Sequence, residues 1–307
     1  MKSGKAFEIF VKRILINIGF TEVKSDGLFV YDASPGQMIQ GLGEAHNADV
    51  LLEPPVQTPF FYKTKLLIEC KDYNKAVGLA TVRGVLGLRE DINHFEIVDV
   101  HKLQLRQSQR RKGIVDTFDR CTYQVAIASM EGFTIPAQNF AATHRIPLIA
   151  FNKMTFWNGF RDILQQISND GNLTEKEQEY SVTRFADSIA SRMAVAITNS
   201  GQMLFLYNEF EECCSFATNY ELFWVSPDLP WKLVSGNRQY SFQLPESILE
   251  QWLNDSTSDI ERRKEAINCK ENFMSNMVVY YNENGYPTIK MISIDKARLE
   301  EAKSMLK

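Results

Sequence analysis

The sequence lacks the short motifs that define several large enzyme classes. Its 307 residues contain no Gly-x-Ser-x-Gly elbow, no phosphate-binding loop and no dinucleotide-binding glycine pattern. Serine-hydrolase, P-loop nucleotidase and nicotinamide-cofactor functions are therefore without support. The four histidines also lack the spacing that a zinc site requires.

Cysteine pairs and long apolar runs are missing as well. The five cysteines form no Cys-x-x-Cys pair, which indicates reduced thiols rather than a disulfide framework. No run reaches the roughly 18 apolar residues of a membrane helix. Glu8, Lys12 and Arg13 interrupt the first apolar segment, unlike the core of a signal peptide. We therefore expect a cytoplasmic protein without membrane association.

Charge of one sign is not in excess. The net charge is −4 and charged residues make up 23% of the chain, so the overall charge does not favour nucleic acid or anionic lipid. Binding of a polyanion must then come from a local basic patch. The length and the hydrophobic fraction of 44% allow one large or two ordinary domains.

The first half of the chain alternates between helical and strand patterns. Apolar residues at helical spacing predict an opening helix over residues 7–18, which ends at Gly19. Helices are also predicted at 82–92 and 135–144, a loop at 34–47, and strands at 27–32, 48–53, 66–70, 124–129 and 146–151. This order predicts a mixed sheet with helices on both faces.

The second half of the chain has a different pattern of predicted elements, with hairpins instead of alternating helices and strands. The polar segment 168–179 is typical of a junction, so we divide the chain into residues 1–167 and an α+β domain at 168–307 with a role in targeting, sensing or oligomerisation. Hairpins are predicted with turns at 199–201 and 284–285, and a helix at 245–253.

Two charges interrupt the apolar strand at 66–70. Residues two apart in a strand share a face, so Glu69 and Lys71 point the same way. If the strand at 48–53 pairs with it as a hairpin, Asp49 lies beside them. Two adjacent carboxylates need a cation or a proton, and oxygen ligands suit Mg²⁺ or Mn²⁺. Such a metal acidifies a water that the lysine orients or deprotonates. The alternative is a surface salt bridge, with Asp49 capping a turn.

Several segments resemble a known nuclease family in their order. They are AFEIFVKRILINIGF, GLGEAHNADVLL, LLIECKDY, a helix containing VRGVLG, and IASMEGFTIPAQNFAATHRIPLIAF. Together, over about residues 1–155, they resemble the Mrr-like restriction endonuclease branch of the PD-(D/E)XK nuclease superfamily. One departure is Ala48, which stands where the proline of the family's name would be.

The resemblance implies a restriction-endonuclease-like mixed sheet flanked by helices, and a Mg²⁺-dependent DNA endonuclease in restriction or antiphage defence. It makes Asp49, Glu69 and the backbone carbonyl of Cys70 the metal ligands, and Lys71 the catalytic lysine. Mn²⁺ is expected to substitute. In the family a glutamate of the opening helix often completes the site, and Glu8 takes that place. The alternative for Glu8 is an ion pair with Lys12, four residues on.

Five further residues are candidates for contact with DNA. His46 lies in a glycine-flanked segment three residues before Asp49, where it contacts the scissile phosphate or is a plain loop histidine. A basic run either holds the DNA backbone or forms a solvated helix face. It contains Arg106, Arg110, Arg111 and Lys112.

Two other functions stay open: a nuclease of the same fold acting on branched DNA or RNA, and a non-catalytic nucleic-acid-binding protein.

Because one active site cuts one strand, a double-strand break predicts a homodimer or a higher even-numbered oligomer. Phe223, Trp224 and Trp231 are either interface residues or core of their own domain. Other proteins of a defence system are possible partners.

Overall fold

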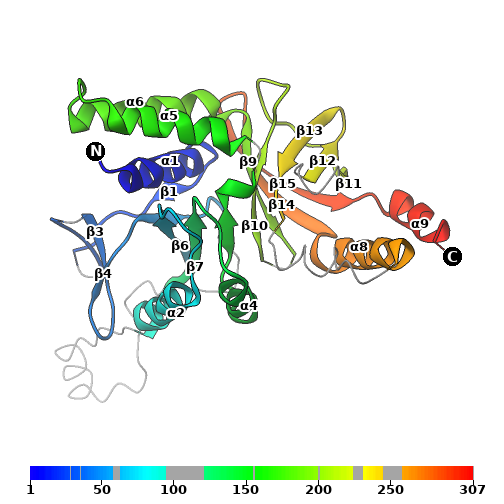
Figure 1. Ribbon diagram of the computed structural model, residues 1–307, viewed down its shortest axis with the longest axis horizontal. Helices are drawn as coiled ribbons and strands as arrows, with labels where there is room; N and C mark the ends of the chain where they lie inside the picture. Colours follow the sequence, from blue (N-terminus) through cyan, green and yellow to red (C-terminus); the bar gives the residue numbers. More distant parts are fainter. Residues whose placement is uncertain are drawn as a thin grey trace, which may run out of the picture.

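The computed structural model describes residues 1–27, 29–34, 36–57, 63–94, 121–154, 156–199, 201–223, 231–244 and 258–306. Over these residues the chain is a mixed α/β protein that contains a five-stranded sheet and a closed barrel of seven strands (Figure 1). The predicted helix at 245–253 lies outside the described residues. None of the helices in the described ranges is long and apolar enough to cross a membrane.

The first sheet is mixed, as the alternating pattern predicts. Its spatial order is β1-β5-β6-β7-β8, with antiparallel pairing from β1 to β6 and parallel pairing from β6 to β8. The strands are β1 (Thr21–Glu22), β5 (Val50–Glu53), β6 (Lys63–Lys71), β7 (Cys121–Ser129) and β8 (Leu148–Ala150), and β8 runs into the short 3-10 helix η1 (Phe151–Lys153).

Helices cover both faces of this sheet (Figure 1). They are α1 (Ser3–Asn17), α5 (Trp157–Asn169) and α6 (Glu175–Ala190) on one side, and α2 (Leu79–His94) and α4 (Ile135–His144) on the other. The alternation of β6 supplies both layers, since Leu66 and Ile68 pack towards α1 while Leu67 packs towards α2 and α4. Glu69 and Lys71 continue the row of Leu67 to the end of the strand.

A small antiparallel sheet occupies part of the segment that we predicted as a loop. It consists of β2 (Val30–Ala33), β3 (Gly36–Gln40) and β4 (Ala45–Asn47). The prediction for residues 34–47 was therefore wrong, because the glycines mark the turns of a hairpin rather than an irregular chain. The loop 41–44 joins β3 to β4, and Asp49 follows two residues after β4.

The second half of the chain forms the barrel, in which every neighbouring pair is antiparallel except β11 and β15. Both predicted hairpins are present. Asn284 and Gly285 have φ of 54° and 89°, as the turn between β14 and β15 requires. The elements are β9 (Met193–Thr198), β10 (Met203–Tyr207), β11 (Asn219–Phe223), β12 (Trp231–Ser235), β13 (Arg238–Phe242), α8 (Asp259–Phe273), β14 (Asn276–Glu283), β15 (Tyr286–Ile294) and α9 (Lys296–Ser304).

The aromatic residues considered for an interface separate into two kinds. Trp231 is only 3% exposed and belongs to the barrel's hydrophobic cluster, so it is core rather than surface. Phe223 is 47% exposed at the end of β11. Trp224 lies outside the described residues.

The expected boundary at residues 167 and 168 falls inside α5. One hydrophobic cluster contains Leu164 of α5, Val182 of α6 and the barrel residues Met193 and Phe205, together with α1 and the first sheet. The sheet and the barrel therefore share a core at this joint.

The C-terminal end of α1 contacts the barrel. Gly19 has φ of +114°, and the amides of Gly19 and Phe20 donate to the carbonyls of Ile16 and Leu15 in a Schellman arrangement. The Phe20 ring lies 5.4 Å from the Tyr280 ring of β14.

Gly19 lies close to Pro287 of β15, so a substitution at Gly19 tests how α1 packs on the barrel. A Cβ added there would lie 2.7 Å from Cβ of Pro287, and the positive φ is unfavourable for alanine. We expect Gly19→Ala to lower the free energy of unfolding by about 1–3 kcal/mol in urea denaturation. Gly87→Ala, in the open interior of α2, should instead raise it by up to ~1 kcal/mol. Equal behaviour of the two variants would contradict the packing of α1 on the barrel.

Candidate functional site

Pairing of β5 with β6 places Asp49 beside Glu69. Val50 pairs with Ile68 in an antiparallel register, so the residue before Val50 lies next to the residue after Ile68. Oδ2 of Asp49 accepts a hydrogen bond of 2.9 Å from the backbone amide of Cys70. The hairpin that the sequence pattern required is thus present, and it fixes the Asp49 carboxylate at the end of the strand.

Lys71 joins the two carboxylates. Its Nζ lies 2.7 Å from Oε2 of Glu69 and 3.9 Å from Oδ2 of Asp49. The three side chains are between 14% and 20% exposed, so they form a partly buried cluster that solvent can still reach. The Glu69–Lys71 ion pair of the alternative interpretation is therefore present, but it is partly buried rather than on an exposed edge.

The electrostatics of the cluster favour binding of a cation. Burial and the neighbouring Asp49 charge raise the pKa of the Glu69 carboxyl, against the opposing effect of Lys71. Burial lowers the pKa of Lys71, but the charge and hydrogen bond of Glu69, together with Asp49, outweigh it and leave the pKa above its ordinary value. One ammonium therefore serves two carboxylates, and the pair retains an excess of negative charge.

Glu8 lies at the edge of the same cluster. Burial and the charge of Asp49 raise the pKa of Glu8, which places its carboxyl within the field of the site. Its salt-bridge partner is Lys5, at 3.1 Å. The alternative pair with Lys12 is not formed, because Lys12 contacts Glu22 at 2.6 Å.

His46 contacts a residue that the sequence pattern did not single out. Its Nε2 lies 2.7 Å from Oδ2 of Asp91 on α2, and Oδ1 of Asp91 accepts a hydrogen bond of 2.8 Å from the amide of Gly43. These two contacts lower the pKa of the Asp91 carboxyl. The charge of His46 also lowers the pKa of Glu69, so the imidazole is near the carboxylate cluster. No spacing rule links a helix residue to a strand residue 45 positions away, which is why Asp91 was missed.

The donors present fit a hard divalent cation in part. In the described ranges, no group of three or more His, Cys, Asp or Glu side chains is arranged to hold a metal ion. Asp49 and Glu69 supply two carboxylates, and Mg²⁺ commonly takes one or two carboxylates plus waters and substrate phosphates. Burial, followed by the charge of Asp49, raises the pKa of the Cys70 thiol well above its ordinary value, so the sulfur is a poor ligand.

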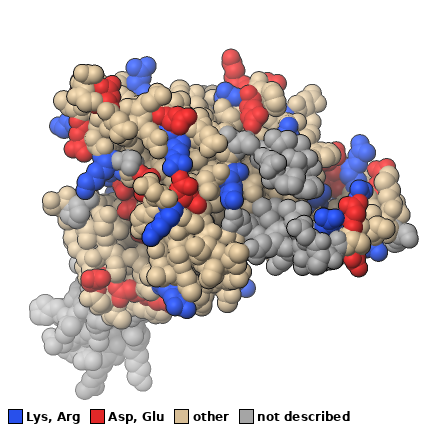
Figure 2. Space-filling view, viewed as in Figure 1, with Lys and Arg blue, Asp and Glu red and all other residues tan. Residues whose placement is uncertain are grey.

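The structure does not describe the four basic residues that we predicted to contact DNA. Arg106, Arg110, Arg111 and Lys112 lie outside the described residues. On the face drawn in Figure 2, the described acidic and basic side chains are interspersed rather than separated by sign.

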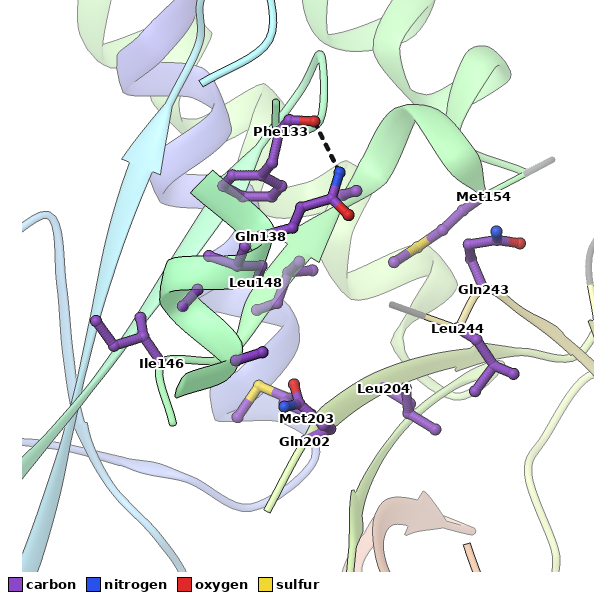
Figure 3. Close-up of a pocket in the computed structure, with 14 residues that line it drawn as sticks. Phe133, Gln138, Ile146, Leu148, Met154, Gln202, Met203, Leu204, Gln243 and Leu244 are labelled. Carbon is purple, nitrogen blue, oxygen red and sulfur yellow. Dashed lines mark hydrogen bonds between the residues drawn. The ribbon is translucent and has the colours of Figure 1, made fainter. Parts of the chain in front are cut away.

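A pocket at the joint of sheet and barrel is chemically different from the cluster (Figure 3). The space between its lining residues that no atom fills is about 570 Å³, a volume that includes open solvent. Gln138, Gln202 and Gln243 are among the lining residues. None of the described residues that line it is charged. They are Phe133, Gln138, Ala141, Ala142, Ile146, Leu148, Ile149, Ala150, Met154, Gln202, Met203, Leu204, Gln243 and Leu244. None of the described lining residues therefore supplies a titratable acid or base.

Comparisons with known proteins do not assign a family. No family model matches the chain, and no curated protein matches it. Among solved structures, the crystal structure of a protein of unknown function, AF1548, is similar with 14% identity and a TM-score of 0.32, over 61% of this chain and 98% of that chain. A TM-score this low supports neither a fold nor a function.

The raised pKa of Glu69 predicts that the charged form of this carboxyl lowers the stability of the folded protein. Its ionisation is unfavourable in the folded chain, so stability is lost as the pH rises through that pKa. We expect Glu69→Gln to unfold at a higher urea concentration than wild type at pH 7. The difference should shrink as the pH falls towards the ordinary carboxyl pKa of about 4.3.

Glu177 provides a control of opposite sign. Hydrogen bonds from Thr174 in the cap of α6 lower the pKa of Glu177, so its charge stabilises the fold above the ordinary carboxyl pKa. Glu177→Gln should therefore unfold at a lower urea concentration at pH 7. A loss of stability in both variants would contradict the electrostatic account of Glu69.

Proposed function

We propose that the protein is a metal-dependent endonuclease that hydrolyses DNA phosphodiester bonds in restriction or antiphage defence. The observation that supports this best is the cluster of Asp49, Glu69 and Lys71 at the adjoining ends of β5 and β6. Two carboxylates with a lysine suit metal-assisted attack of water on a phosphodiester. The proposal includes a restriction-endonuclease-like fold of the Mrr-like PD-(D/E)XK branch, with which the antiparallel and parallel pairing around β6 is compatible.

In this proposal, Asp49, Glu69 and the backbone carbonyl of Cys70 hold Mg²⁺, and Mn²⁺ can substitute. A metal held there would lower the pKa of a water and neutralise charge on the phosphodiester. Lys71, held as an ammonium by Glu69, donates a hydrogen bond to the attacking water or to a phosphate oxygen. Glu8 adds a carboxylate at the rim of the site, where it would accept a hydrogen bond from a water that enters it.

The decisive experiment measures cleavage of linear, nicked, branched and methylated DNA, and of RNA, with Mg²⁺ or with chelator. We expect DNA cleavage by wild type that chelator abolishes. Asp49→Ala and Glu69→Ala should each lose about 10³-fold or more in rate, because each removes a ligand of the same cation. Asp32→Ala, an exposed aspartate of β2, is the matched control and should cleave like wild type.

Calorimetric titration with Mn²⁺ in the absence of DNA separates the roles of the residues. Wild type and Lys71→Ala should bind the ion, while Asp49→Ala should not. Lys71→Ala should still lose cleavage rate. Full activity of Asp49→Ala, or cleavage that persists in chelator, would refute the proposal; cleavage of RNA or branched DNA alone would change the substrate and keep the chemistry.

The assembly that we propose is a homodimer or a higher even-numbered oligomer. The described residues of each chain contain one Asp49–Glu69–Lys71 cluster, and a double-strand break needs two sites of opposite polarity. Light scattering should give at least twice the chain mass of 35.2 kDa at micromolar concentration, with or without DNA. A monomer in both conditions would contradict the assembly, and nicking without double-strand cleavage would then be expected.

A further inference from the structure

Asp91 connects α2 to the hairpin that precedes the carboxylate cluster. Its carboxylate accepts hydrogen bonds from the Gly43 amide and contacts Nε2 of His46, and its backbone carbonyl accepts one of 3.2 Å from the Leu42 amide. One helix residue thus holds both the loop 41–44 and the imidazole of His46 on β4.

The glycines of the loop allow this close approach. A Cβ at Gly41 would collide with Oδ2 of Asp91 and with the carbonyl of Glu44. A Cβ at Gly43 would lie 3.3 Å from Oδ1 of Asp91. The spacing Gly-Leu-Gly therefore lets the loop close around the carboxylate.

The contact with Asp91 also fixes which edge of the imidazole is available. Nε2 of His46 is engaged by the carboxylate, and the side chain of His46 is 17% exposed. Its Nδ1 makes no hydrogen bond with any described residue. The charge of the same imidazole lowers the pKa of Glu69, so the ring is close enough to act on the carboxylate cluster.

We propose that Asp91 is a positioning residue that holds His46 so that Nδ1 of the imidazole contacts a backbone phosphate of bound DNA next to the carboxylate cluster. This inference rests on the proposed function. With Nε2 engaged by Asp91, Nδ1 is the ring nitrogen left to face bound DNA, and an N–H at Nδ1 complements a phosphate oxygen. The competing role for Asp91 is structural, as a simple tether of the loop to α2.

Two substitutions of His46 distinguish these roles. The amide nitrogen of asparagine falls near the position of Nδ1, whereas that of glutamine falls near Nε2. His46→Asn therefore keeps a donor towards the DNA and loses the contact with Asp91, while His46→Gln keeps the contact with Asp91 and loses the donor. The affinity for a fluorescently labelled duplex, measured by anisotropy without metal, and the separate kcat and KM of Mg²⁺-dependent cleavage are the readouts.

We expect His46→Gln to weaken duplex binding and raise KM by about 10- to 100-fold, the range for loss of a hydrogen bond to a charged group. His46→Asn should retain more of both than His46→Gln. Asp91→Asn should raise KM while the fold persists, which thermal unfolding checks. Glu90→Gln, at the exposed position before Asp91 on α2, is the matched control and should match wild type.

The outcomes separate this inference from the proposed function. If wild type binds and cleaves DNA while His46→Gln matches it and His46→Asn is impaired, Asp91 is a tether and the inference is overturned. If all three variants match wild type, it is overturned as well. If wild type neither binds nor cleaves any nucleic acid with Mg²⁺ or Mn²⁺, the proposed function fails and the inference fails with it.

Discussion

The burial of α1 is the packing interaction on which the rest of the structure depends. Its apolar residues are almost completely inaccessible and contact the first sheet, α5, α6 and the barrel in one hydrophobic cluster; they are Phe7, Phe10, Val11, Ile14, Leu15 and Ile18. Each such side chain contributes about 1.5–3 kcal/mol on burial. Because Glu8 is on the same helix, the core that stabilises the protein also sets the position of a carboxylate at the candidate site.

Much of the fold could be predicted because local patterns and tertiary packing agree. The apolar periodicity of α1 indicates a helix, and the dense apolar runs of β6 and β7 indicate buried strands. Asn284 with Gly285 indicates the tight turn between β14 and β15. The approach of Asp49 to Glu69 followed from the alternation of strand residues and one assumption, that neighbouring strands pair as a hairpin. The roles of these residues in catalysis are predictions that the geometry is compatible with and that cleavage assays must test.

Features that depend on distant contacts could not be predicted in this way. The segment 168–179 was interpreted as a junction because it is polar, and this composition gives no sign that α5 and α6, on either side of it, pack into one cluster with α1. Closure of the barrel depends on a parallel pair, β11 with β15, that no local pattern encodes. The role of Asp91 likewise depends on a helix and a loop that only the folded chain brings together.

The shared core also limits how the chain can be divided or recombined. A fragment that ends at residue 167 keeps α1 but removes α6 and β10, which supply Val182, Ala186 and Phe205 to the same cluster. The exposed side of α1 would then be a continuous apolar stripe, and such surfaces promote aggregation. The C-terminal half is therefore not an exchangeable cassette, and chimeras that replace it must reproduce the surface that packs on α1.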